Sequence, residues 1–275
     1  MKYTILILLS LLCTSLSYAF PIQDIQNRIQ YLEANDIEPV CLFDLDETLI
    51  HSAKRKVLSY LKAIDTNRAM FTKNYPQETL AAEQALGNGG GDDSLILTLP
   101  NQYDSAALFG KMGISNTAFI HAIDQLMLPI YLSNDFISQD TAYRGAIQLL
   151  KLFYSAHGKV FFVTSRYESS QSIETFKNLV DNHLYRNSAQ SHVLMRKDGE
   201  ISIDFKKRAY QEVLRELTPS EQIVLVGENE PENMNAMMNS FPNAVPVFVT
   251  GAILNTKVEI QNNPLLILTK NFIRD

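Results

Sequence analysis

Residues 40–48 read VCLFDLDET, and the organisation of the whole chain can be worked out from this stretch. The first four residues form a continuous apolar run, which is typical of a strand buried on both faces of a parallel sheet. Two carboxylates, Asp44 and Asp46, follow at once. Ligands bind at the carboxyl edge of such sheets, so this position favours a site. Taken alone, two acids after a strand are equally typical of a capped turn.

Similar apolar runs return at residues 160–163, 223–226 and 245–249, with a shorter one at 193–195. Helical periodicity lies between them, most clearly at 142–155, and an amphipathic helix is predicted over 21–32. Alternation of strands and helices predicts an α/β fold with a doubly wound parallel sheet.

The pattern changes between residue 49 and about residue 135, where helical stretches near 54–64 and 117–127 flank the sequence NGGGDD at 88–93. These glycines are not followed by the helix and lysine of a phosphate-binding loop, so they indicate a flexible connection. We predict a mostly helical cap domain over residues 51–135, inserted into an α/β core formed by residues 20–50 and 136–275.

The N-terminus has the pattern of a signal peptide over residues 1–19. Lys2 precedes an apolar run at 5–12, and Ser17 and Ala19 occupy the small-residue positions of a cleavage site. A retained anchor and a lipidated Cys13 are the alternatives. We therefore expect an exported protein, either periplasmic or secreted. Cleavage would leave Cys41 as the single cysteine, to which we assign no chemistry.

The chain has 275 residues, of which 46% are hydrophobic and 20% are charged, as in an ordinary globular protein. Its formal net charge is −6, and the basic clusters at 54–56 and 206–208 are short. Affinity for nucleic acid comes from clustered lysine and arginine, so nucleic-acid binding is not expected. After the N-terminal segment no run approaches the roughly 20 apolar residues that span a bilayer, so no stable membrane insertion is expected after signal removal.

Two further polar elements are expected near the carboxylates. Thr164, Ser165 and Arg166 end the second apolar run, and we predict that Ser169 or Ser170 caps the next helix, which leaves Thr164 to hold an oxyanion. Lys206 falls in the middle of the apolar face of a predicted helix. A lysine in that position needs a negative partner.

Residues 227–233 read GENEPEN, and they follow the third apolar run. This turn carries three glutamates without histidine or cysteine. Oxygen ligands of this kind suit Mg²⁺ far better than Zn²⁺. A solvated acidic loop is the alternative.

Taken together and in this order, the four elements resemble the haloacid dehalogenase superfamily of phosphohydrolases. DLDET at 44–48 matches its DxDxT signature, Thr164 its second-strand hydroxyl, and Lys206 its lysine. Glu228 and Glu232 match its acidic pair, in which aspartates are usual. The resemblance covers the α/β core and does not extend to the cap.

The resemblance implies a phosphomonoester hydrolase in which Asp44 attacks phosphorus and Asp46 protonates the leaving group and later activates water. It also implies a Mg²⁺ site formed by Asp44, the backbone carbonyl of Asp46, Glu228 and Glu232. Thr164 and Lys206 would bind the transferring oxygens, and Thr48 and Arg166 would contact the substrate.

The substrate is expected to be a phosphorylated small molecule or a phosphoprotein. Members of the superfamily that cleave carbon–halogen bonds or pump ions lack a residue such as Asp46, which favours a phosphatase. Glutamate at 228 and 232 moves each carboxylate by roughly 1.5 Å, so we expect changed metal affinity and turnover. Two alternatives stay open: an exported binding module or effector with weak or no catalysis, and a protein phosphatase, because DLDETLIHS at 44–52 looks like the first motif of polymerase-tail phosphatases.

Overall fold

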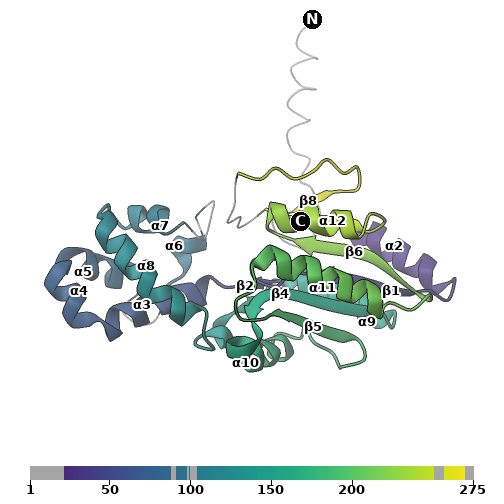
Figure 1. Ribbon diagram of the computed structural model, residues 1–275, viewed down its shortest axis with the longest axis horizontal. Helices are drawn as coiled ribbons and strands as arrows, with labels where there is room; N and C mark the ends of the chain where they lie inside the picture. The colour runs from purple at the N-terminus through teal and green to yellow at the C-terminus, as the bar shows by residue number, and fades with distance from the viewer. Residues whose placement is uncertain (1–21, 88–90, 98, 100–103, 251–256, 270–275) are drawn as a thin grey trace, which may run out of the picture.

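The computed structural model describes residues 22–87, 91–97, 99, 104–250 and 257–269. The predicted signal peptide and most of the glycine loop lie outside these residues. Within them, a three-layer α/β core stands beside a helical domain, as Figure 1 shows. No helix among the described residues is long and apolar enough to cross a bilayer.

The core contains a six-stranded parallel sheet with the order β5-β4-β1-β6-β7-β8. Its strands are β1 (Glu38–Phe43), β4 (Lys159–Tyr167), β5 (Ser191–Arg196), β6 (Glu221–Glu228), β7 (Val245–Val249) and β8 (Ile267–Thr269). This arrangement confirms the predicted fold class. β8, which is only three residues long, was not among the strands predicted from the sequence.

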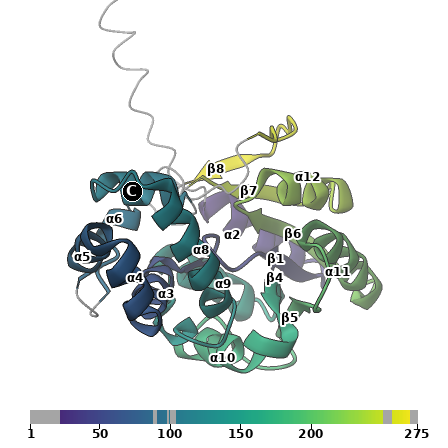
Figure 2. The ribbon, with the colours of Figure 1, turned by 60° about the vertical axis from the view of Figure 1, so that its left-hand side comes forward.

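Helices cover both faces of the sheet because the strands are apolar on both sides. On one face lie α2 (Ile22–Glu33), α9 (Arg144–Ser155) and α10 (Glu168–Asp181), and on the other lie α11 (Ser202–Glu216) and α12 (Pro231–Ser240). Within β1, Cys41 and Phe43 pack into the hydrophobic core on the side of α2, α9 and α10. Val40 and Leu42 pack into the core on the side of α11 and α12. Figure 2 shows the two helical layers from a second direction.

The cap is inserted between two short strands, β2 (Ile50–His51) and β3 (Thr141–Ala142), which pair antiparallel and bring both ends of the insertion together. Its described helices are α3 (Ala53–Thr66), α4 (Arg68–Asn74), α5 (Pro76–Ala85), α6 (Ser94–Leu97), α7 (Ser105–Lys111) and α8 (Thr117–Tyr131), followed by the 3-10 helix η1 (Ile137–Gln139). The cap packs around a hydrophobic core of its own, separate from the cores of the sheet.

Gly227 allows β6 to lie against β1 immediately beside the candidate site. It pairs with Phe43 in the sheet, and a Cβ atom at Gly227 would lie 2.4 Å from Cδ1 of Phe43. The backbone carbonyl of Gly227 also accepts a hydrogen bond from the backbone N–H of Asp44. The absence of a side chain at residue 227 therefore helps to set the position of Asp44.

We expect Gly227→Ala to destabilise the protein by about 1–3 kcal/mol, because the added methyl must displace the ring of Phe43 in a packed core. Gly110→Ala is the matched control. A Cβ at Gly110 meets no atom within 4 Å, so alanine in helix α7 should be neutral or stabilising by up to about 1 kcal/mol. Urea denaturation of both variants measures the difference. Equal free energies of unfolding would contradict this account of Gly227.

Candidate active site

Asp44 is the first residue after β1, and it is held at the carboxyl edge of the sheet. The residue is 6% exposed, and its carboxylate accepts a hydrogen bond from the Nζ of Lys206 at 2.5 Å. The hydroxyl of Thr48 donates to its other oxygen at 3.2 Å. Thr48 is positioned by the tight turn after β1, in which the backbone N–H groups of Thr48, Leu49 and Ile50 all donate to the carbonyl of Leu45. The turn therefore fixes the orientation of Asp44.

Lys206 lies on the buried face of α11 and is 1% exposed. Its Nζ also donates to Oε2 of Glu228 at 3.0 Å and to the backbone carbonyl of Val163 at 2.7 Å. Burial alone would lower the pKa of Lys206, but the two carboxylates raise it above its ordinary value. A positively charged ammonium is thus fixed between Asp44 and Glu228.

The two buried carboxylates share this single ammonium, which leaves a surplus of negative charge. Burial, followed by repulsion from Glu228, raises the pKa of Asp44 to about 7. Glu228 is fully buried at the end of β6, where its Oε1 accepts hydrogen bonds from the backbone N–H groups of Asn229 and Glu230. An added cation near these carboxylates would stabilise their ionised forms.

Asp46 has different surroundings, because two arginines bind its carboxylate. Arg166 donates from Nε to Oδ2 at 2.9 Å and from Nη2 to Oδ1 at 2.7 Å, and Arg55 donates from Nη2 to Oδ1 at 2.5 Å. Burial acts to raise the pKa of Asp46, but these guanidinium groups hold it well below its usual range. In this arrangement Asp46 is an ion.

The same arginines bind Asp140, which is 1% exposed and precedes β3. Nη2 of Arg166 donates to Oδ2 of Asp140 at 2.7 Å, and Nε of Arg55 lies 3.3 Å from its Oδ1. Because Arg55 belongs to cap helix α3 and Arg166 to core strand β4, this buried network of Asp46, Arg55, Arg166 and Asp140 joins the cap to the sheet.

Glu47 stabilises the turn between the two acids and the cap. Its φ of 60° is in the left-handed region that non-glycine residues rarely adopt. Its Oε1 accepts hydrogen bonds from the backbone N–H and the hydroxyl of Ser52, and its Oε2 accepts one from the hydroxyl of Tyr143. These bonds connect both ends of the cap insertion to the loop that carries Asp44 and Asp46.

A cavity of about 260 Å³ opens at this edge, between the sheet and the cap. Among the site residues predicted from the sequence, the structure brings Asp44, Asp46, Arg166 and Glu228 to its wall, while Lys206 and Thr48 contact Asp44 from behind. The cap contributes Arg55, Tyr131 and Leu132.

Two further predicted site residues, Thr164 and Glu232, are also not among the residues that line the cavity. Thr164 is fully buried, and its Oγ1 accepts a weak hydrogen bond from the backbone N–H of Arg166, whereas the next residue, Ser165, does line the cavity. Glu232 is exposed in the first turn of α12, and Asn233 takes the position at the cavity wall. The predicted metal ligands Glu228 and Glu232 are therefore not brought together.

The expectation that Ser169 or Ser170 caps the helix after β4 is wrong. Helix α10 begins at Glu168, and the side chain of its N-cap residue, Tyr167, makes no cap hydrogen bond. The backbone N–H of Tyr167 instead donates to Oε1 of Gln171. The hydroxyl of Ser169 donates to Asp198, and that of Ser170 donates to the backbone carbonyl of Leu132. Strand β4 continues three residues beyond Thr164, and helix α10 begins at the next residue. Both serines therefore lie within the first turn of α10 and not before it.

Sequence reasoning missed Arg55 and Asp140. Arg55 belongs to the basic cluster 54–56, which the sequence presents as surface charge, yet it is 1% exposed. Helical periodicity gave no clear signal, because Val57 lies on the opposite side of the helix from Arg55, and Ser59, which shares its face, is not apolar. Asp140 has no signal in the sequence, because its place depends on the pairing of β2 with β3.

The cavity wall is rich in oxygen atoms, which are the ligands that divalent cations such as Mg²⁺ prefer. No group of three or more histidine, cysteine, aspartate or glutamate side chains within the described ranges is placed to hold a metal ion. Mg²⁺, however, is often bound through one or two carboxylates, with water and other oxygens completing its shell. Asp44 and Glu228, which carry more negative charge than Lys206 neutralises, fit that requirement.

A comparison with family models found no match, and a comparison with curated proteins also found none. Solved structures of similar architecture include CbbY from Rhodobacter sphaeroides in complex with phosphate, which has 13% sequence identity, a TM-score of 0.44, and coverage of 86% of this chain and 95% of that one. A HAD hydrolase, family IA, variant 3, from Entamoeba histolytica HM-1:IMSS has 13% identity, a TM-score of 0.43, and coverage of 85% and 93%. A hydrolase from Pseudomonas syringae has 16% identity, a TM-score of 0.38, and coverage of 78% and 85%.

The parallel sheet with β1 in its middle, the carboxylates directly after β1 and the helical insertion that follows them are the deciding features of the architecture. The core is a doubly wound α/β fold with a helical insertion after β1. The solved structures named above have TM-scores below 0.5, so their likeness carries no argument about activity. What this core does has to be argued from its own residues.

Proposed function

We propose that this protein is an exported phosphomonoester hydrolase that uses Asp44 as a nucleophile and requires Mg²⁺. The observation that carries the proposal is the placement of Asp44: a buried carboxylate at the wall of a cavity, oriented by Thr48 and paired with Lys206 at 2.5 Å. An acid whose pKa is raised to about 7 is a typical functional group in a cleft.

The first chemical step transfers the phosphoryl group to Asp44. One carboxylate oxygen of Asp44 forms a bond to phosphorus while the bond from phosphorus to the leaving oxygen breaks, and Asp46 gives a proton to that oxygen. Water then attacks the phosphorus of the aspartyl-phosphate while Asp46 takes a proton from that water. The bond between phosphorus and the oxygen of Asp44 breaks, inorganic phosphate leaves, and the carboxylate of Asp44 is restored. Lys206 remains beside the reacting oxygens and offsets their charge.

Asp46 must acquire a proton before it can act, since Arg55 and Arg166 keep it ionised in this arrangement. A bound phosphate is itself an anion and competes for the same guanidinium groups. We therefore propose that substrate takes over part of these contacts, which raises the pKa of Asp46 and releases it to act as an acid. Arg55 makes this exchange dependent on the cap.

Mg²⁺ would be held by Asp44, the backbone carbonyl of Asp46 and Glu228, where it would neutralise charge on the transferring phosphoryl group. Glu232, on the exposed side of α12, supports no direct contact in this arrangement. The substitution of glutamate for aspartate at residue 228 lengthens the carboxylate arm that would reach the ion.

Hydrolysis of an aryl phosphate tests the function. We expect the purified protein to hydrolyse p-nitrophenyl phosphate with Mg²⁺, to lose that activity in EDTA, and to recover it when excess Mg²⁺ is added. Release of p-nitrophenol is the measurement. Equal turnover in EDTA would contradict a Mg²⁺-dependent reaction.

A binding module with weak or no catalysis is the second candidate. It is favoured by two observations: the resting ion pairs of Asp46 with two arginines, and the position of Glu232 outside the cavity. No hydrolysis of any phosphomonoester, together with retained binding of inorganic phosphate by calorimetry, would favour this candidate over the enzyme.

A further inference from the structure

Arg196 differs from the other cations of the active-site cavity. Arg55 and Arg166 are each bound to Asp46 and Asp140, and Lys206 is bound to Asp44 and Glu228. Arg196 also lines the cavity, yet it forms no ion pair and no side-chain hydrogen bond with any residue that the structure describes. Its Nε is buried without a partner. A positive charge at the cavity wall is therefore left for a ligand.

The backbone and an aromatic ring hold Arg196 in place. It is the last residue of β5, where it pairs with Tyr167 of β4, and its guanidinium carbon lies 4.1 Å from the centre of the Tyr167 ring. A guanidinium stacked on an aromatic face keeps its N–H groups directed outward in the ring plane and loses little further freedom when it binds an anion. Arg196 thus lies preorganised at the carboxyl edge of the sheet, on the β5 side of Asp44.

Polar groups surround this part of the cavity. Ser165 and Ser202 line it, with their hydroxyl oxygens 2.6 Å apart, and Gln171 lies there as well. Ser202 is the first residue of the 15-residue helix α11, whose N-cap residue, Ile201, makes no side-chain hydrogen bond to the first turn. An uncapped helix N-terminus favours a negative group, although the exposed Asp204 in the same turn offsets part of that effect.

We propose that Arg196 binds a second anionic group of the substrate, so that the enzyme acts on phosphomonoesters that also carry a carboxylate or a second phosphate. This inference rests on the proposed phosphatase function. The phosphoryl group to be cleaved lies against Asp44 and Lys206, and the second anion lies against Arg196 with the hydroxyls of Ser165 and Ser202. A charge-assisted contact of this kind changes binding by about 10- to 100-fold.

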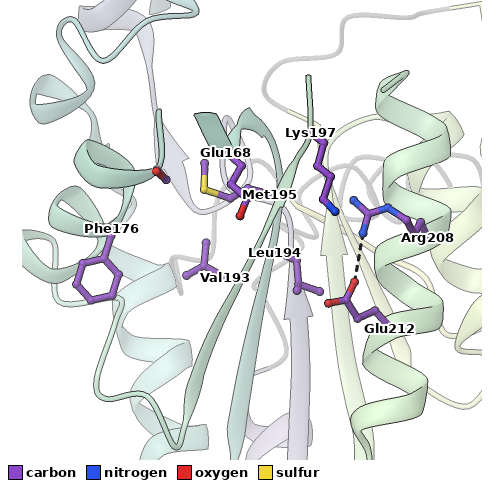
Figure 3. A pocket seen from close by; sticks show the side chains of 9 residues that line it. Glu168, Phe176, Val193, Leu194, Met195, Lys197, Arg208 and Glu212 are labelled. Carbon is purple, nitrogen blue, oxygen red and sulfur yellow. Dashed lines mark hydrogen bonds and ion pairs between the residues drawn. The ribbon is translucent and has the colours of Figure 1, made fainter. Parts of the chain in front are cut away.

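Lys197 provides a matched control. It is also basic and directly follows Arg196, but it lines a different cavity, between α10 and α11 beside β5, together with Arg208 and Glu212, as Figure 3 shows. Lys197→Gln removes one positive charge from the same region without touching the active-site cavity. Any effect of net charge alone should therefore appear equally in Lys197→Gln and in Arg196→Gln.

The experiment compares aryl phosphates that differ in one substituent. The substituents, in the meta or para position, are a neutral carbamoyl group, a carboxylate and a phosphonomethyl group, the last two of which represent the two sources of the second anion. We expect the wild-type protein and Lys197→Gln to prefer an anionic compound over the carbamoyl compound by about tenfold or more in kcat/KM. In Arg196→Gln this preference should fall by about tenfold or more relative to wild type. The anionic substituent that shows the preference identifies whether the second group is a carboxylate or a phosphate.

The compounds differ in leaving-group reactivity, but this difference is the same in every protein. It therefore cancels when the kcat/KM ratio of one variant is compared with that of another. The same preference in wild type and Arg196→Gln would overturn the proposal, as would a loss in Lys197→Gln of the same size. If no compound is hydrolysed, the proposed function fails, and calorimetric affinities of the same compounds decide about Arg196. Tighter binding of an anionic compound that disappears in Arg196→Gln would still support an anion subsite, and equal affinities would overturn it.

Discussion

Asp44→Asn is expected to reduce hydrolysis of p-nitrophenyl phosphate by about 10⁴-fold or more, because the amide cannot form the aspartyl-phosphate. The substitution is nearly isosteric. Thr48 can still donate to the amide oxygen, and Lys206 keeps Glu228 as a partner at 3.0 Å. The loss should therefore appear in kcat while the protein stays folded. Steady-state kinetics and circular dichroism measure the two effects.

Acid quenching gives an independent readout of the same prediction. Wild-type protein mixed with ³²P-labelled substrate and quenched in acid should retain label that hydroxylamine removes, and Asp44→Asn should retain none. Asp36→Asn, in the turn before β1, is the control and should behave as wild type. Activity of Asp44→Asn within tenfold of wild type would exclude Asp44 as the nucleophile.

Arg166→Ala is expected to reduce the free energy of unfolding by about 3–5 kcal/mol, because it leaves buried carboxylates without their main partner. Arg166 binds both Asp46 and Asp140, and its own side chain is 2% exposed. Arg55 remains, but one guanidinium then serves two carboxylates. Activity should fall as well, since Asp46 loses the group that positions it.

Arg208→Ala is the control for the stability effect. Arg208 pairs with Glu200 and Glu212, but its side chain is 37% exposed, so its removal should cost less than about 1 kcal/mol. Urea denaturation of both variants at neutral pH gives the comparison. If Arg166→Ala is no less stable than Arg208→Ala, the buried network does not hold the cap against the core.

Much of the core could be predicted from the sequence, because strands buried on both faces carry continuous apolar runs. β1, β4, β6 and β7 each contain such a run, and the carboxylates after β1 follow from its end. The burial of Lys206 could also be predicted, because its place on the apolar face of a helix depends only on local periodicity.

The rest of the site depends on contacts between distant segments, which local patterns do not contain. Arg55 reaches Asp46 only because β2 and β3 pair and bring the cap against the sheet.

The position of Glu232, in contrast, depends on where α12 begins, which is a local feature. Pro231, a residue favoured at the first position of a helix, signals that start and places Glu232 and Asn233 on different sides.

The two-residue strands at the base of the cap have an evolutionary consequence. Since the insertion leaves and re-enters the core at adjacent points and has its own hydrophobic interior, a different helical module could be exchanged there without disturbing the sheet. Such an exchange would give a new selectivity with the old chemistry. Arg55 limits this freedom, because any replacement module would have to supply a cation at the same place to neutralise Asp46 and Asp140.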